Sequence, residues 1–149
     1  MIDAKIIADS IRKGGVIYIC GNGGLAAESE HFAAELMGKY AFETYFPCIA
    51  LTTNSALITA ISNDMGFENV FSHQVETLGR KGDVLIAMTT SASANIVKAI
   101  KVAQGKGMIT FLLDRKVLVG TGTAEIQNNA IQMLHVLAYE IKKELQCYL

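Results

Sequence analysis

Two residues with acid–base side chains stand four positions apart within the stretch from Val16 to Lys39. From Leu25 onward this stretch has strong helix formers and an apolar face, so it predicts a helix. On a helix, His31 and Glu35 share one face. Their spacing suits metal ligation or paired acid–base work, and a merely solvated helix face is the competing interpretation.

A glycine turn precedes that helix. Gly21-Asn22-Gly23-Gly24 follows the apolar run Val16–Cys20, which has the length of a buried strand. A helix that begins at such a turn offers free N–H groups and a positive dipole end to a phosphate. The turn also fits a loose dinucleotide pattern, but that pattern requires an acid at the end of the second strand. The second strand ends in Leu51-Thr52-Thr53-Asn54 without one, so no nucleotide cofactor is expected. No Lys-Ser/Thr pair follows the glycines, which excludes a P-loop.

A run of hydroxyl side chains, Thr89, Thr90, Ser91 and Ser93, precedes a predicted helix that begins at Ala94. Hydroxyls and free N–H groups ahead of a helix bind phosphate without any cation. Ordinary capping would need only one of them.

The last predicted helix carries Gln127 and His135, two turns apart and roughly on one side. A histidine in that position is more often a core or surface residue than a catalyst. His73 has no companion, and we assign it no role.

The elements that must position these residues follow from hydrophobic periodicity. Helices are expected over 2–13, 25–39, 55–62, 68–78, 94–104 and 123–146, with a turn over 63–66 and strands over 16–20, 48–52, 83–88, 108–113 and 117–119. Because strands alternate with helices, we expect one α/β domain over 1–149, a three-layer α/β/α sandwich around a parallel sheet with right-handed crossovers. Ligands of such sheets bind beyond the carboxyl ends of the strands, where the glycine turn and the hydroxyl run both fall.

Composition narrows the function classes. The 149 residues are 51% hydrophobic and 18% charged, with a net charge of -1. This balance argues against nucleic acid or an anionic membrane as partner, and the low charge predicts surface buried by oligomerisation. Three cysteines (Cys20, Cys48, Cys147) show no metal-binding spacing, which favours a reducing compartment. With no signal-peptide pattern and no apolar run long enough to span a membrane, we expect a cytoplasmic protein.

Four stretches, taken together, resemble the sugar isomerase (SIS) domain of phosphoheptose isomerases, the sedoheptulose 7-phosphate isomerases of bacterial heptose synthesis. They are CGNGGLAAESEHFAAEL, SNDMGFENVFSHQVETLGRKGDVLIAMTTS, SANIVKAI and TAEIQNNAIQMLHVLAYEI. The resemblance covers nearly the whole chain. It implies a flavodoxin-like, doubly wound fold, assembled as a homotetramer with a sugar phosphate bound between subunits.

The resemblance also implies roles. Glu35 and His135 would be the catalytic pair, and a zinc ion, where one is bound, would be held by His31, Glu35, Gln127 and His135. The substrate contacts would be Asn22, Gly23, Gly24, Asp64, Thr89, Thr90, Ser91, Ser93 and Gln127. A non-catalytic SIS-domain regulator that binds a sugar phosphate or a protein is the alternative.

The chain departs from the family pattern at several places, and three of them bear on the site or the sheet. Leu25 stands where the family usually has a serine, and the hydroxyl run lacks the glycine that shapes the phosphate turn. Between Asp114 and Thr123 the family has a further full strand. Its loss would leave an unpaired sheet edge.

Overall fold

The computed structural model describes residues 2–146, so Cys147 lies outside the described residues. Four strands form the sheet: β1 (Ile17–Cys20), β2 (Cys48–Ala50), β3 (Val84–Met88) and β4 (Ile109–Leu113). The helices are α1 (Ala4–Arg12), α2 (Gly24–Met37), α3 (Ser55–Met65), α4 (Ser72–Leu78), α5 (Ala94–Gly105) and α6 (Thr123–Gln146), with a 3₁₀ turn, η1, at Phe67–Asn69.

The sheet is entirely parallel, with the strand order β2-β1-β3-β4. In register, Ile17 of β1 pairs with Cys48 on one side and with Val84 on the other. The chain therefore reverses its direction of winding between β1 and β3, which is where doubly wound sheets bind ligands. The loops that follow these two strands are the glycine turn and the hydroxyl run, as the sequence predicts.

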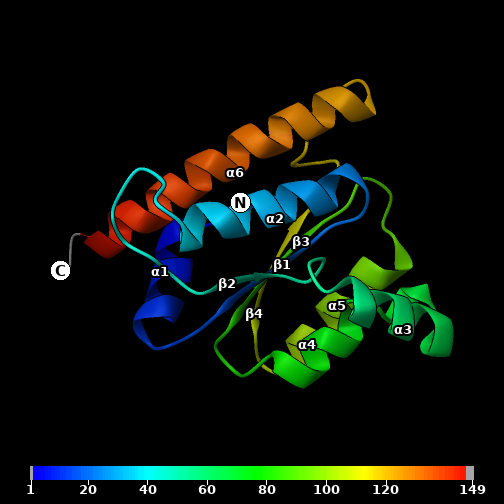
Figure 1. The fold of residues 1–149 in the computed structure, drawn as a ribbon. Helices are drawn as coiled ribbons and strands as arrows, with labels where there is room; N and C mark the ends of the chain where they lie inside the picture. The colour runs from blue at the N-terminus through cyan, green and yellow to red at the C-terminus, as the bar shows by residue number, and fades with distance from the viewer. Residues whose placement is uncertain (1, 147–149) are drawn as a thin grey trace.

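Helices cover both faces of the sheet, and Figure 1 shows α2 and α6 on one side and α4 and α5 on the other. Neighbouring residues of β1 face opposite layers: Ile17 and Ile19 pack with α1, α2 and α6, whereas Tyr18 and Cys20 pack with α4 and α5. All four are buried, so the strand reads as a continuous apolar run. The predicted three-layer α/β/α fold is confirmed.

Helices α2 and α6 lie side by side and run in the same direction (Figure 1). Near their starts, the amide at the end of the Gln127 side chain lies where a Cβ atom of Gly24 would be, so the two helices approach closely there. Near the end of α2, the Lys142 ammonium donates to the Gly38 carbonyl. This packing places residues of α2 next to residues of α6 that lie about 100 positions later in the sequence.

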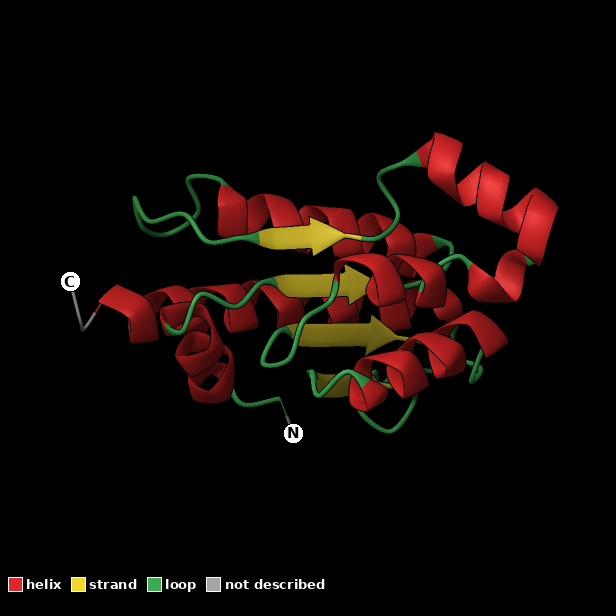
Figure 2. Ribbon diagram, turned by 90° about the horizontal axis from the view of Figure 1, so that it is seen from below, coloured by secondary structure: helices red, strands yellow, loops and turns green. Residues whose placement is uncertain are grey.

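Helix α3 stands off beyond the carboxyl ends of the strands (Figure 2). Within it, Ile61 is the one buried residue. The turn predicted over 63–66 is wrong in extent, because α3 continues through Met65 and ends where Gly66 takes a φ of 92°. The helix predicted over 68–78 divides into η1 and α4.

The strand predicted at Val117–Val119 is also wrong. The amides of Val117 and Leu118 both bond to the Asp114 carbonyl, which forms a turn. The Leu118 side chain is buried in the core, and its burial explains the apolar pattern without a strand. β4 is consequently an edge strand of the sheet, as expected from the absence of the further strand that the family has. Leu112 on β4 is 44% exposed.

The thiols of Cys20 and Cys48 are free and buried. Burial raises the pKa of Cys20 to about 12, so its thiol stays protonated near neutrality and acts as a small hydrophobic group. No helix within residues 2–146 is both long and apolar enough to cross a membrane.

Candidate active site

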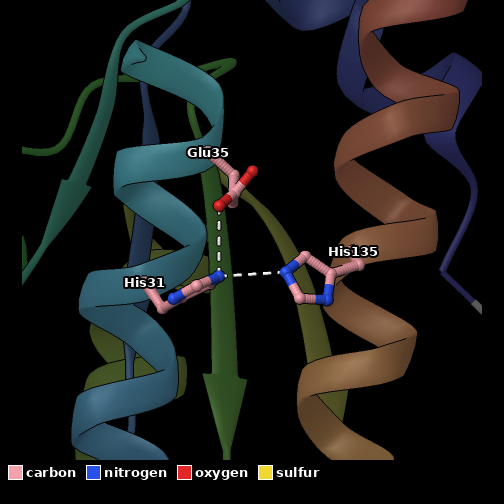
Figure 3. A group of neighbouring side chains, drawn as sticks. All are labelled: His31, Glu35 and His135. Atoms are coloured by element: carbon pink, nitrogen blue, oxygen red, sulfur yellow. Dashed lines mark hydrogen bonds and ion pairs between the residues drawn. The ribbon is translucent and has the colours of Figure 1, made fainter. Parts of the chain in front are cut away.

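Three potential proton carriers meet between α2 and α6. His31 Nε2 lies 3.1 Å from Glu35 Oε1 and 2.9 Å from His135 Nε2. Figure 3 shows His31 and Glu35 projecting from α2 towards His135 on α6. The helical spacing of His31 and Glu35 and the long last helix were readable from sequence, whereas their meeting with His135 depends on the packing of α6 on α2.

The electrostatics of this trio are unusual for a solvated helix face. Glu35 Oε2 is buried and has no hydrogen-bond partner, and the Glu35 side chain is 18% exposed against 45% for His31. Two neutral imidazoles with facing Nε2 atoms require one proton between them, because one nitrogen must accept. The trio therefore holds lone pairs that either share a proton or bind a cation.

The donor set suits a metal. One nitrogen from each histidine and one Glu35 oxygen lie within 4.8 Å of one another. Two imidazole nitrogens and a carboxylate are ligands that zinc accepts at catalytic sites, which also keep one position open. The unpartnered Glu35 oxygen leaves that carboxylate free to turn towards an ion.

The glycine turn is tied to the start of α5. The side-chain amides of Asn22 and Asn95 exchange two hydrogen bonds, of 3.0 and 2.8 Å, and Asn95 is 2% exposed. This reciprocal pair joins the two ligand loops across the β1–β3 switch point. Asn22, predicted to bind substrate, thus has a structural partner that sequence reasoning did not supply.

The hydroxyl run folds around Thr89. Its Oγ1 accepts from the backbone amides of Ser91 and Ser93, and the hydroxyls of these two serines lie 3.2 Å apart. Thr89 is buried and Thr90 is half-buried. Ala92 has a φ of 50°, a left-handed conformation that favours glycine. It stands where the family pattern resembled by this chain has a glycine. The tight turn is kept without its usual residue.

A cavity of about 220 Å³ lies beside the glycine turn, between the start of α2 and the η1 region. Asn22, Gly23, Glu30 and Thr52 line it. The Thr52 hydroxyl is buried without a hydrogen-bond partner, which makes it a candidate contact that sequence reasoning missed. The sequence does offer a signal for this contact, because Thr52 places a hydroxyl at the carboxyl end of the second predicted strand, where ligands of parallel sheets bind.

Several predicted site residues lie apart from the trio within this chain. The glycine turn ends at Gly24, eleven residues before Glu35, which is about 16 Å along the axis of α2. Gln127 packs over Gly24, eight residues before His135, which is about 12 Å along a helix axis. Asp64 is exposed near the end of α3, and its carboxylate accepts from the neighbouring Asn63 amide. The roles of these residues stay predictions.

Comparison with known proteins decides the family. The SIS domain family model matches residues 2–113. A phosphoheptose isomerase from Campylobacter jejuni (serotype O:6) is 44% identical over 148 residues, which cover 89% of this chain and 80% of the relative. The chain belongs to the phosphoheptose isomerase family of SIS-domain proteins. A second family member, from Rhodospirillum rubrum, is 50% identical over 107 residues, which span 70% of this chain but only 57% of that relative.

Solved structures of the phosphoheptose isomerase family share the fold. The enzyme from Neisseria gonorrhoeae superposes with a TM-score of 0.84 at 37% identity, and that from Francisella tularensis with 0.87 at 30%. Each match covers 94% of this chain and 83% of the other.

Leu25 can now be placed against the phosphoheptose isomerase pattern. Its side chain is 4% exposed and belongs to the core cluster on the α2 and α6 side of the sheet. Leucine at this position therefore adds core packing and does not line the cavity beside the turn.

Proposed function

We propose that this protein interconverts sedoheptulose 7-phosphate and D-glycero-D-manno-heptose 7-phosphate, as a sugar phosphate isomerase of bacterial heptose precursor synthesis. One observation carries the proposal: α6 brings His135 to 2.9 Å from His31 and beside Glu35, so two acid–base groups face one space. Names of relatives over most of the chain support the same activity.

The reaction moves a proton between C1 and C2 of the sugar through an enediol. The Glu35 carboxylate takes a proton from C1, the electron pair of that C–H bond forms the C1–C2 double bond, and the ketone oxygen takes a proton from His135. Return of a proton from Glu35 to C2, with loss of the O1 proton to His135, gives the aldehyde. Neither residue is consumed, and the same pair serves the reverse direction.

We further propose that His31, Glu35 and His135 hold one zinc ion per subunit. Gln127, the predicted fourth ligand, lies over Gly24 in its own chain and would complete such a set only from a neighbouring subunit. Bound zinc polarises a carbonyl and stabilises oxyanions. His31, which has no separate acid–base task in the scheme, orients Glu35 through their 3.1 Å contact.

The sugar phosphate is proposed to span the carboxyl edge of the sheet. Thr89, Thr90, Ser91 and Ser93 would take the phosphate, with the start of α5 behind them. Asn22, Gly23, Gly24 and Asp64 would contact the sugar chain.

Subunit assembly completes the proposal. Residues 1–149 would form one SIS domain of a cytoplasmic homotetramer with active sites between subunits. Met65, the last residue of the weakly packed α3, and Phe67, the first residue of η1, are 52% and 56% exposed, as expected of surface that a second subunit covers. Asp64 lies beside them and would therefore be placed at the same subunit interface, where it could contact a sugar bound to the neighbouring subunit.

The test is an assay of sedoheptulose 7-phosphate turnover with and without added zinc. Glu35→Gln and His135→Gln should each lose about 10²- to 10⁴-fold in kcat, the usual share of a general acid or base. His73→Gln is the matched control and should stay active, because that histidine is unrelated to the trio. Full turnover by Glu35→Gln would refute the mechanism, and an inactive wild type at every zinc level would refute the isomerase itself.

A further inference from the structure

A buried lysine supports the helix that carries His31 and Glu35. Lys142 is 0% exposed, a rare burial for this residue type. Its Nζ donates to the carbonyls of Gly38, at 2.8 Å, and Tyr40, at 3.1 Å. Gly38 is the C-cap of α2, so the ammonium satisfies carbonyls at the negative end of that helix.

The same lysine acts electrostatically near the site. Burial lowers the pKa of Lys142, and the negative charge of Glu35 acts in the opposite direction. A charge this deep is costly unless it is paired or hydrogen-bonded, and here two backbone carbonyls accept from the ammonium. Removing the ammonium would leave both carbonyls without this donor, so Lys142 supports the end of α2 as well as the geometry of the site.

Tyr40, whose carbonyl accepts a hydrogen bond from Lys142, also contacts His135. The Tyr40 ring packs against the His135 ring, with 5.6 Å between centroids, and its hydroxyl donates to the His135 carbonyl at 3.4 Å. Since Lys142 is seven residues beyond His135, both lie on the same side of α6. Tyr40 is thus attached to α6 at two levels.

We infer that Lys142 and Tyr40 are positioning residues that set the distance between Glu35 on α2 and His135 on α6. Lys142 fixes the end of α2 to α6, and Tyr40 fixes the plane of the His135 ring. The kinetic part of this inference rests on the proposed isomerase activity, whereas its geometric part does not.

The first experiment removes the charge. Lys142→Met keeps most of the length of the side chain but removes its ammonium. It should lower kcat about 10- to 100-fold with KM unchanged, because misplacement by about 1 Å is enough for such a loss. Lys143→Met is the matched control: this neighbour is exposed, pairs with Glu140 at 3.8 Å, and should leave kcat as in the wild type.

The second experiment separates the ring from the hydroxyl of Tyr40. The ring-proton NMR signals of His135, identified by their loss in His135→Gln, should shift in Tyr40→Leu, which removes the aromatic ring current. They should stay close to the wild-type positions in Tyr40→Phe, and kcat should recover in that variant. Tyr139→Leu removes a ring that packs on Phe42 and should leave the His135 signals in place.

The outcomes divide cleanly. A folded Lys142→Met with wild-type kcat, or a Tyr40→Leu with unshifted His135 signals, overturns the inference. If the wild type does not turn over sedoheptulose 7-phosphate, the proposed function fails, and the NMR signals of His135 in Lys142→Met and Tyr40→Leu still decide the geometric part. If Lys142→Met does not fold, the Tyr40 variants decide the role of Tyr40, and Lys142→Gln, which keeps a donor for the two carbonyls without the charge, decides that of Lys142 by the same kcat and NMR readouts.

Discussion

The amide pair between Asn22 and Asn95 allows a quantitative test of how the two ligand loops are joined. Each of its two hydrogen bonds links neutral groups, and such bonds contribute about 0.5–1.5 kcal/mol each. In a cycle of Asn22→Ala, Asn95→Ala and the double variant, we therefore expect a coupling energy of about 1–3 kcal/mol in the free energy of unfolding.

Burial also predicts an asymmetry within that cycle. Asn22 is half-buried, whereas Asn95 is 2% exposed. Asn22→Ala leaves the Asn95 amide buried and short of a partner, so it should cost more than a half-exposed polar residue normally does. The sugar phosphate KM should rise in both single variants, because the turn and the hydroxyl run lose their link.

Urea unfolding followed by circular dichroism measures the four free energies. A matched cycle on Gln104 and Thr110, whose exposed contact is 3.5 Å long, should be additive. Additivity at Asn22 and Asn95 within about 0.5 kcal/mol, the usual range for independent sites, would refute the idea that this pair couples the loops.

Three further predictions concern single residues. Ala92→Gly relieves a left-handed alanine at φ 50°, so it should raise the free energy of unfolding, by up to about 1 kcal/mol after the entropy of an added glycine is counted; a loss of stability in urea unfolding would contradict this. Thr52→Val should raise the substrate KM about 2- to 12-fold, the equivalent of one hydrogen bond, whereas Thr44→Val, which removes another buried unpartnered hydroxyl, should not; equal KM values in steady-state assays would exclude a Thr52 contact. The hydroxyl and backbone amide of Thr121 both donate to Glu125 and lower its pKa, so Glu125 stabilises the fold above its ordinary pKa and loses this effect as pH falls through the folded value. The stability difference between wild type and Glu125→Gln, measured across pH, should accordingly shrink in acid, and a difference independent of pH would refute this assignment.

The fold was largely readable from the sequence because its signals are local. Apolar runs such as Asp83–Met88, glycine turns and the regular alternation of strands with helices determine a parallel three-layer sheet. Two of the errors of detail also have local causes. Val117–Val119 has the composition of a strand but no neighbouring strand to pair with, and Leu118 is apolar because the core needs it. Asn63 to Met65 has turn-like composition but stays helical until Gly66 ends α3.

The site was predictable only in part, because it depends on packing between distant elements. Spacing shows that His31 and Glu35 share a face of α2, but it does not show that α6 runs parallel beside that face. The same packing sets Gln127 over Gly24 and His135 over His31. Thr52, Tyr40 and Lys142 went unnoticed, since a threonine after a strand, a tyrosine in a loop and a lysine in a helix are all ordinary until their burial and partners are known.

The place of His135 on the last helix has a consequence for how the protein is made. Synthesis proceeds from the N-terminus at about 5–20 residues per second, and domains begin to fold as their residues emerge. By the time β4 has left the ribosome, all four strands, His31 and Glu35 are available. The trio, the buried lysine and one wall of the core arrive only with α6. A nascent chain can therefore pair its strands before the trio exists, and the proposed acid–base chemistry has to wait until α6 has docked.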